Sequence, residues 1–306
     1  MNIQPIKNYL TLIRFPNLFT LPSNIFVGYV STHTHNPIEI HTISLVILVS
    51  LCLYAVGVIF NDIADRKIDR KERPNRPIPS GKIGERNAII LALLLIVISI
   101  AVSCSVSAKT FTAVIVLITI IFLYDFVLKN TPVGSVAIGA TRLLNIILGA
   151  SLNLSNVVDG ENEYMFYRLF LVCISEFLYI VGISALSKYE AHNNLTFQIG
   201  WFHALLFLSP LIIGVYATSI GLFNDNAWIY LFVFGSFILY MLKVTASLKP
   251  DMASHTLQKV ISLLIVGIIV HDAIYIGGSL DSWYFGMSTF VLLVPAIILG
   301  KRFYVT

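Results

Sequence analysis

The stretch that decides the fold closes a long apolar segment and reads Asn61-Asp62-Ile63-Ala64-Asp65-Arg66-Lys67-Ile68-Asp69. The residues before it, 41–61, form an apolar window long enough to cross a bilayer as a helix. At about 100° per residue, the three aspartates lie within roughly 60° of one another on one helical face. The sequence therefore predicts aligned carboxylates where this helix leaves the membrane.

Three aligned carboxylates repel one another unless a cation lies among them. Oxygen ligands of this kind favour Mg²⁺, which is commonly shared between one or two carboxylates and substrate phosphates. Basic residues follow directly: Arg66, Lys67, Arg70, Lys71, Arg73 and Arg76. An acidic face beside a basic segment is suited to a diphosphate-bearing substrate. The alternative is an ordinary charged loop, but such a loop needs Lys and Arg rather than in-phase aspartates.

Composition indicates an all-α membrane protein. Of the 306 residues, 57% are hydrophobic and only 12% are charged, and the mean hydropathy is +0.84. Those values are typical of a polytopic membrane protein rather than a soluble domain, and no role in binding nucleic acid is expected. Apolar windows of spanning length occur near 15–31, 41–61, 87–107, 110–128, 133–153, 166–186, 199–219, 227–247, 258–277 and 283–300.

The distribution of Lys and Arg predicts the orientation. Basic residues cluster in alternate connections, including the aspartate-containing loop, and only Lys109 breaks the pattern. By the positive-inside rule, both termini and that loop are cytoplasmic, which requires an even number of spans and favours ten. The polar N-terminal residues 1–10 show no signal peptide. We expect one integral membrane domain over residues 1–306.

The stretch from Asn61 to Lys82, which includes Arg73-Pro74-Asn75-Arg76-Pro77-Ile78-Pro79-Ser80-Gly81-Lys82, resembles the first signature of the UbiA superfamily of intramembrane prenyltransferases. Arg14-Phe15-Pro16-Asn17 is similar to that family's first helix, and Tyr124-Asp125 with Lys129, Gly139 and Arg142 is similar to its fourth and fifth. The resemblance implies a bundle of nine to ten transmembrane helices around a central cavity. It also implies a prenyl diphosphate donor, a hydrophobic or aromatic acceptor and a bilayer setting.

The resemblance and the charge pattern together predict the site residues. In the family, the aspartates hold Mg²⁺ against the diphosphate of the donor. We therefore expect a metal site at Asn61, Asp62, Asp65 and Asp69. The cationic residues expected to bind the diphosphate or to stabilise its departure are Arg66, Arg70, Arg76, Lys129 and Arg142.

Polar residues inside the apolar windows need partners of their own. A cation at Arg142, well inside its window, costs roughly 2.5–3.5 kcal/mol, so it should face a wet or anionic cavity together with Asn145. Asn24 is expected either to contact substrate or to bridge helices, as intramembrane amides often do. For His271 and Asp272 the favoured interpretation is mutual pairing or a hydrogen bond that bridges helices.

A second metal-binding loop is expected after residues 166–186, where most relatives carry two or three aspartates. This chain instead reads Ser187-Lys188-Tyr189-Glu190-Ala191-His192-Asn193-Asn194. Glu190 is the candidate metal ligand and catalytic residue, and His192 a second possible ligand. With Arg142-Leu143-Leu144-Asn145, Asp272-Ala273 and Phe303-Tyr304-Val305-Thr306, the loop resembles the EboC-like subfamily, which is associated with bacterial secondary-metabolite clusters.

The sequence therefore predicts Mg²⁺-dependent transfer of a prenyl group to an unidentified acceptor. A relative that binds or moves isoprenoids without catalysis is one alternative, suggested by the sparse second loop. A CDP-alcohol phosphotransferase is another, but Asp65-Arg66-Lys67 does not supply the Asp-Gly and Ala-Arg elements of that signature.

Overall fold

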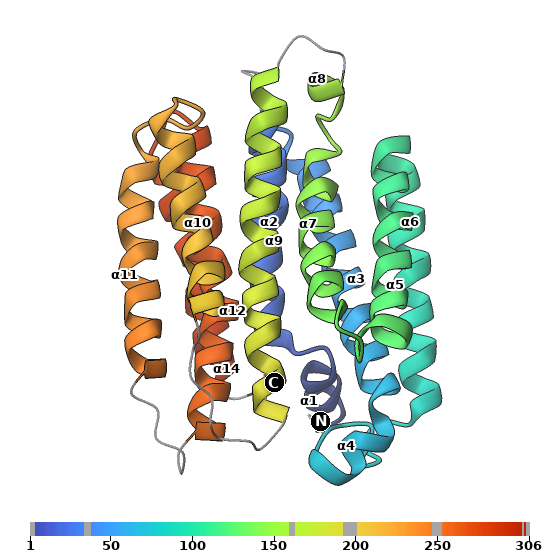
Figure 1. The fold of residues 1–306 in the computed structure, drawn as a ribbon. Helices are drawn as coiled ribbons and strands as arrows, with labels where there is room; N and C mark the ends of the chain where they lie inside the picture. The colour runs from blue at the N-terminus through green and yellow to red at the C-terminus, as the bar shows by residue number, and fades with distance from the viewer. Residues whose placement is uncertain are drawn as a thin grey trace.

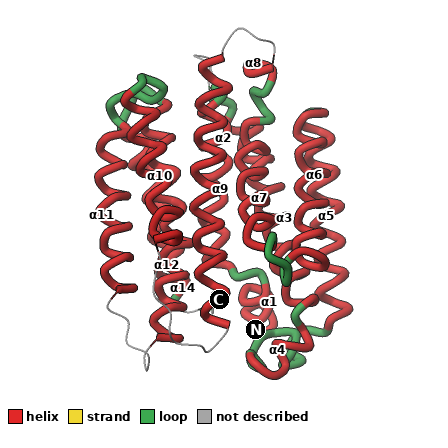
Figure 2. Tube along the Cα trace, in the orientation of Figure 1, coloured by secondary structure: helices red, strands yellow, loops and turns green. Residues whose placement is uncertain are grey.

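Helices make up the regular structure of the described chain, which a computed structural model gives for residues 4–33, 38–158, 163–191, 201–246, 253–301 and 303 (Figures 1 and 2). Side chains at a few helix ends, Glu190 among them, lie outside this description. The elements are α1 (Gln4–Leu12), η1 (Phe15–Thr20), α2 (Leu21–Ser31), α3 (Ile40–Ala64), α4 (Arg66–Glu72), α5 (Glu85–Val106), α6 (Ala108–Leu123), η2 (Tyr124–Leu128), α7 (Gly134–Ala150), α8 (Ser155–Val158), α9 (Glu163–Ala191), α10 (Trp201–Ser219), α11 (Ala227–Ala246), α12 (Ala253–Ser279), α13 (Tyr284–Thr289), η4 (Phe290–Leu292) and α14 (Leu293–Gly300).

Every predicted apolar window coincides with one or more of these helices. Among the described residues, six helices are long and apolar enough to span a bilayer: Ile40–Ala64, Glu85–Val106, Ala108–Leu128, Glu163–Ser187, Ala227–Thr245 and Leu257–Ser279. Gly134–Ala150, His203–Ser219 and Tyr284–Gly300 are shorter apolar helices. The chain is a multi-pass integral membrane protein, and the count of nine to ten spans stays a prediction.

Three windows, 15–31, 110–128 and 283–300, are each divided between shorter helical elements. Residues 15–31 divide into the 3₁₀ helix η1 and the α-helix α2, each with a proline in its first turn. Proline lacks a backbone N–H and is tolerated there but not inside a helix, so Pro16 and Pro22 produce the irregular helix that the sequence indicated. The segment that carries the three aspartates is also divided between two helices, because α3 stops at Ala64 and α4 begins at Arg66.

The helices separate into central and peripheral members. α2 packs against α3, α7, α9 and α12 and lies inside the bundle. The apolar window of α12 is 78% buried, whereas that of α5 is only 17% buried. Large side chains such as Leu94, Val97 and Phe232 are exposed on α5 and α11. Apolar surface of this extent is suited to lipid rather than water.

Glycines bring α2 and α7 into backbone contact. A Cβ at Gly28 would collide with the Ile146 carbonyl oxygen, and one at Gly149 would collide with the Ile25 carbonyl oxygen. Small residues at such crossings let transmembrane helices approach closely, which is their usual means of packing in lipid. The crossing holds Asn24 of α2 against Asn145 of α7. Both chain ends and α4 lie at one end of the bundle, opposite α8 (Figure 1).

Candidate active site

Arg76 joins the first and third aspartates. Its Nη1 lies 3.2 Å from Asp62 Oδ1 and 2.8 Å from Asp69 Oδ2. All three side chains are buried. Burial raises the pKa of Asp69, against the opposing effect of the Arg76 guanidinium, and burial also lowers the pKa of Arg76. The proline-rich turn after α4 folds Arg76 back over the aspartates.

Arg14 approaches the same carboxylate from the N-terminal side. It lies between α1 and η1 in a left-handed conformation, with φ 48° and ψ 55°. Its Nη2 is 3.4 Å from Asp62 Oδ1. A non-glycine residue in that region is strained, and such strain concentrates at functional sites. Arg14 was not among the residues predicted for the site.

Lys129 reaches the site from the opposite side. It follows the π-helical segment η2, where the chain makes wider turns than an α-helix. Its Nζ donates to Asn61 Oδ1 at 2.6 Å and pairs with Asp65 Oδ2. Short π-helical segments often occur at functional sites, since they redirect side chains. The same segment carries Asp125, which is buried and whose Oδ1 receives no hydrogen bond from the described residues.

The carboxylates are thus divided between two cation groups. Asp62 and Asp69 face Arg14 and Arg76, whereas Asp65 faces Lys129, because the helix breaks at Asp65. The Lys129 ammonium lies between the amide oxygen of Asn61 and a carboxylate oxygen of Asp65 and contacts both. Those are the oxygen donors that Mg²⁺ prefers, so the residues present fit the expected metal.

Two predicted cations lie elsewhere. Arg66 donates to the Ile63 carbonyl oxygen at 3.0 Å and lies 3.3 Å from Glu85 Oε1, so it turns toward α5. Arg70 is exposed on α4, and the described contacts do not bring it to the aspartates. Both predictions assumed that every basic residue of the segment could reach the carboxylates. In α4, however, the buried face belongs to Asp69.

A second polar layer lies deeper in the bundle. Arg142 donates to Thr20 Oγ1 at 3.3 Å and lies 5.5 Å from the centre of the Tyr54 ring. Asn145 Nδ2 donates to Asn24 Oδ1 at 2.9 Å, and Asn145 Oδ1 accepts from Ser50 at 2.6 Å. Asn24 and Asn145 therefore bridge α2, α3 and α7, and Asn24 also reaches Glu176 of α9.

The remaining predicted residues divide into two kinds. The Glu190 side chain and His192 lie outside the described residues. His271 and Asp272 do lie together, with His271 Nδ1 3.3 Å from Asp272 Oδ1, but Glu176 of α9 joins them and was missed. A carboxylate in the middle of an apolar window was the available signal, because such a group needs a partner. The sequence signal for Arg14 was weaker, because the neighbouring residues do not indicate a left-handed conformation at this position.

Comparison with known proteins bears on the family and on the fold. Residues 21–257 match the UbiA prenyltransferase family. The apo structure of a UbiA homolog from Aeropyrum pernix K1 is similar to 84% of this chain and 96% of its own, with a TM-score of 0.66 and 15% identity. A UbiA homolog from Archaeoglobus fulgidus bound to DMAPP and Mg²⁺ covers 87% of this chain and 99% of its own, with a TM-score of 0.58 and 16% identity.

A curated relative is similar over a shorter stretch. The digeranylgeranylglyceryl phosphate synthase of Sulfurisphaera tokodaii is 38% identical over 78 residues, which is 26% of this chain and 28% of that protein. Fold and site together define a helical membrane protein with a carboxylate cluster at one end of its bundle. The family match covers most of the chain, and the protein belongs to the UbiA prenyltransferase family.

Proposed function

We propose that the protein transfers a prenyl group from an isoprenoid diphosphate to a small or aromatic acceptor within the membrane, in a Mg²⁺-dependent reaction. The observation that carries the proposal is the convergence of oxygen donors and cations at one end of α3. Asn61, Asp62, Asp65 and Asp69 provide the oxygens, and Arg14, Arg76 and Lys129 provide the positive charges. The family relationship and the DMAPP and Mg²⁺ bound to the Archaeoglobus homolog support it.

The chemistry follows from the charges. The four oxygen-bearing residues would hold Mg²⁺, which supplies positive charge to the diphosphate when bound. As the allylic C–O bond breaks, its electron pair leaves with the diphosphate, and Lys129, Arg76 and Arg14 are placed to stabilise that charge. Preorganised charge of this kind is commonly the largest contribution to catalysis. Arg142, beside Tyr54, lies deeper, where the prenyl cation would meet the acceptor and the acceptor would lose a proton.

An apolar groove offers a place for the isoprenoid tail. Its volume is about 700 Å³, and it opens between α1, α3 and α5. The lining is largely aliphatic and includes Ile13, Leu18, Leu51, Leu91 and Leu94. Since Ile13 precedes Arg14, this groove begins next to a cation of the site. A hydrocarbon chain there would be shielded from water on one side and in contact with lipid on the other.

The direct test is release of diphosphate from a prenyl diphosphate by the purified protein. We expect Mg²⁺-dependent release by the wild type and at least a hundredfold slower release by Asp65→Asn, since this change removes a charge that holds the metal. Asp281→Asn, which alters an exposed aspartate after α12, is the control and should react normally. Binding of the donor without any release would instead support a non-catalytic isoprenoid-binding protein.

The proposal extends to the second loop. Glu190 would complete a second Mg²⁺ site, and Glu190→Gln should then raise the Mg²⁺ concentration needed for activity, because glutamine keeps the size of the side chain but removes its charge. An unchanged Mg²⁺ requirement would restrict metal binding to the aspartates after α3. We further propose nine to ten spans in one domain over residues 1–306, and a cytoplasmic membrane with both termini and the site on the cytoplasmic side. Secondary-metabolite biosynthesis, as in the EboC-like subfamily, is the proposed setting.

A further inference from the structure

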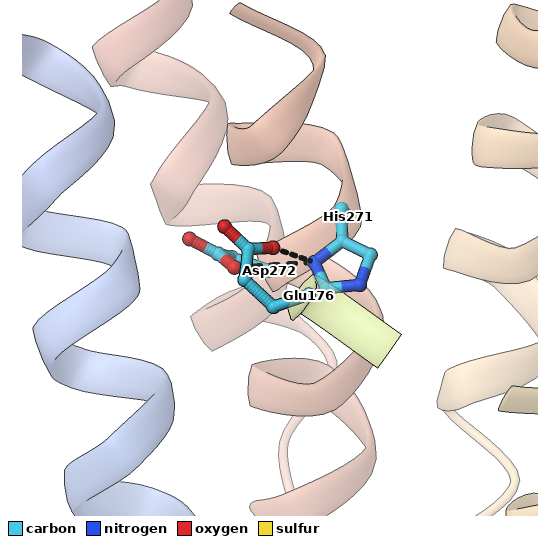
Figure 3. Close-up of side chains that lie close together, drawn as sticks. All are labelled: Glu176, His271 and Asp272. Carbon is cyan, nitrogen blue, oxygen red and sulfur yellow. Dashed lines mark hydrogen bonds and ion pairs between the residues drawn. The ribbon is translucent and has the colours of Figure 1, made fainter. Parts of the chain in front are cut away.

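A second group of ionisable side chains lies inside the bundle, away from the aspartates of α3 and α4. Glu176 of α9 meets His271 and Asp272 of α12, and all three are fully buried (Figure 3). His271 Nδ1 lies 3.0 Å from Glu176 Oε2 and 3.3 Å from Asp272 Oδ1. Nothing in the proposed prenyl transfer uses these residues.

The hydrogen count at this cluster is incomplete. One ring nitrogen, Nδ1 of His271, faces two carboxylate oxygens and can present only one hydrogen. Glu176 Oε2 receives no hydrogen bond within the described part of the chain, although it is fully buried. With both carboxylates ionised, even a protonated imidazole would leave the cluster with one net negative charge. An uncompensated charge is costly at this depth in a membrane protein.

A divalent cation would resolve both the charge and the geometry. Two carboxylates, a neutral imidazole and one divalent ion sum to zero. Metal–ligand bonds of about 2.0–2.2 Å at right-angled to tetrahedral angles place ligand atoms about 3.0–3.5 Å apart. The two separations from Nδ1 fall in this range. In Figure 3 both carboxylates point toward the same ring nitrogen.

Hydrogen bonds hold the outward-facing atoms of all three residues. Ser175 Oγ lies 2.8 Å from His271 Nε2 and accepts from Tyr275 at 2.7 Å. Ser23 donates to Asp272 Oδ2 at 2.7 Å, and Asn24 Nδ2 lies 3.4 Å from Glu176 Oε1. Metal ligands are characteristically oriented by such outer partners. Here those partners leave Nδ1, Oδ1 and Oε2 directed at one another.

We propose that Glu176, His271 and Asp272 bind one divalent transition-metal ion inside the bundle. One imidazole with two carboxylates suits Mn²⁺, Fe²⁺ or Zn²⁺ better than Mg²⁺, which prefers oxygen alone. The ion would link α9 to α12, and through Ser23 and Asn24 it would also position α2. The inference does not depend on the proposed prenyl transfer.

The test is the metal content of the whole protein. It is produced in medium supplied with Mn²⁺, Fe²⁺ and Zn²⁺, washed with EDTA to empty accessible sites, and analysed by elemental mass spectrometry. We expect about one transition-metal ion per chain in the wild type and in the double variant Asp62→Asn/Asp65→Asn. Glu176→Gln should retain less than a tenth of that. Glu163→Gln, exposed at the start of the same helix, is the matched control and should retain the full amount.

X-ray absorption at the edge of the bound metal keeps the test independent of the variants' folding. The wild-type spectrum should show oxygen and nitrogen neighbours with the multiple scattering of one imidazole. A wild type with less than a tenth of an ion per chain would overturn the proposal. So would a metal lost from the Asp62→Asn/Asp65→Asn variant but kept by Glu176→Gln, or a spectrum without an imidazole.

Discussion

Lys129 bonds Asn61 and Asp65, two of the residues that the proposed function assigns to Mg²⁺. Its ammonium neutralises Asp65, so it would compete with a metal for these oxygens, and it is also placed to stabilise a leaving diphosphate. The same cation can compete with the metal before the donor binds and can stabilise the leaving diphosphate during the reaction. The two roles have opposite consequences for Mg²⁺ affinity and for turnover, so they can be separated by one substitution.

Lys129→Met should lower kcat about a hundredfold or more, because it removes charge from the leaving diphosphate. The same change should lower the Mg²⁺ concentration needed for half-maximal donor binding, since a competing cation near Asp65 is gone. Steady-state kinetics and donor binding at several Mg²⁺ concentrations measure both. Lys82→Met, at an exposed lysine of the connection between α4 and α5, is the control. A parallel loss of Mg²⁺ affinity and turnover would contradict the competing role.

At this scale the sequence predicted much of the site. The spacing of Asp62 and Asp69, seven residues apart, placed them on one face, where Arg76 joins them. The contact of Arg14 with Asp62 could not be predicted from helical periodicity, because Arg14 itself adopts a left-handed conformation between α1 and η1. Arg66 turns toward Glu85 instead of the aspartates, because charge alone does not determine the face of a short helix from which a side chain extends, and its role in binding the diphosphate stays a prediction.

Among the elements, the packing of α2 against α7 depends on a close approach of their backbones. Gly28 and Gly149 permit it, and the Asn24–Asn145 bond crosses the same contact. Helix positions were predictable from the apolar windows, because each window is long and carries few charged residues. The break at Asp65 and the π-helical turn before Lys129 were not, since both replace a regular hydrogen-bond pattern by one that tertiary contacts determine.

Gly28→Ala should destabilise the protein by about 1–3 kcal/mol, because the added methyl meets the Ile146 carbonyl oxygen and forces the helices apart. Gly57→Ala is the matched control: its methyl would meet only Ile121 Cγ2, at 3.5 Å, so its effect should stay below about 1 kcal/mol. Unfolding in detergent measures both. Equal stability of the two variants would show that the α2–α7 crossing is less close than described.

The groove between α1, α3 and α5 gives a prediction of its own. Leu51→Trp should fill part of it and raise the KM for a long-chain prenyl diphosphate about tenfold, with little effect on a short-chain donor. Leu48→Trp places the same side chain at an exposed position of α3 that does not line the groove. Steady-state kinetics with both donors measure the effect. Equal KM values for the long-chain donor in the two variants would show that the isoprenoid tail binds elsewhere.

Across the whole molecule, one end of the bundle carries both chain ends and α4 (Figure 1), and α4 carries Asp69. Lys109, the basic residue that breaks the charge pattern, bonds Ser155 Oγ at 2.7 Å beside α8 at the other end. A single lysine there is compatible with the positive-inside rule, which concerns an excess rather than an absolute separation. Whether two connections lie on the same side of the membrane therefore depends on how many helices cross the bilayer between them.

Cysteine labelling in sealed vesicles decides that number for the first half of the chain. Ser80→Cys and Glu163→Cys are both at exposed positions, and Cys104→Ser provides a background without the exposed native thiol. Between them lie α5 and α6, both of spanning length, and α7, whose 17 residues extend about 26 Å. That length is close to the hydrocarbon thickness of about 30 Å, so α7 crosses only if its ends lie near the headgroups.

Three crossings put the two positions on opposite sides. A membrane-impermeant maleimide should then label Ser80→Cys only in inside-out vesicles and Glu163→Cys only in right-side-out vesicles. Labelling of both in the same vesicles would mean two crossings, would remove α7 from the spans, and would place Arg142 at the membrane surface.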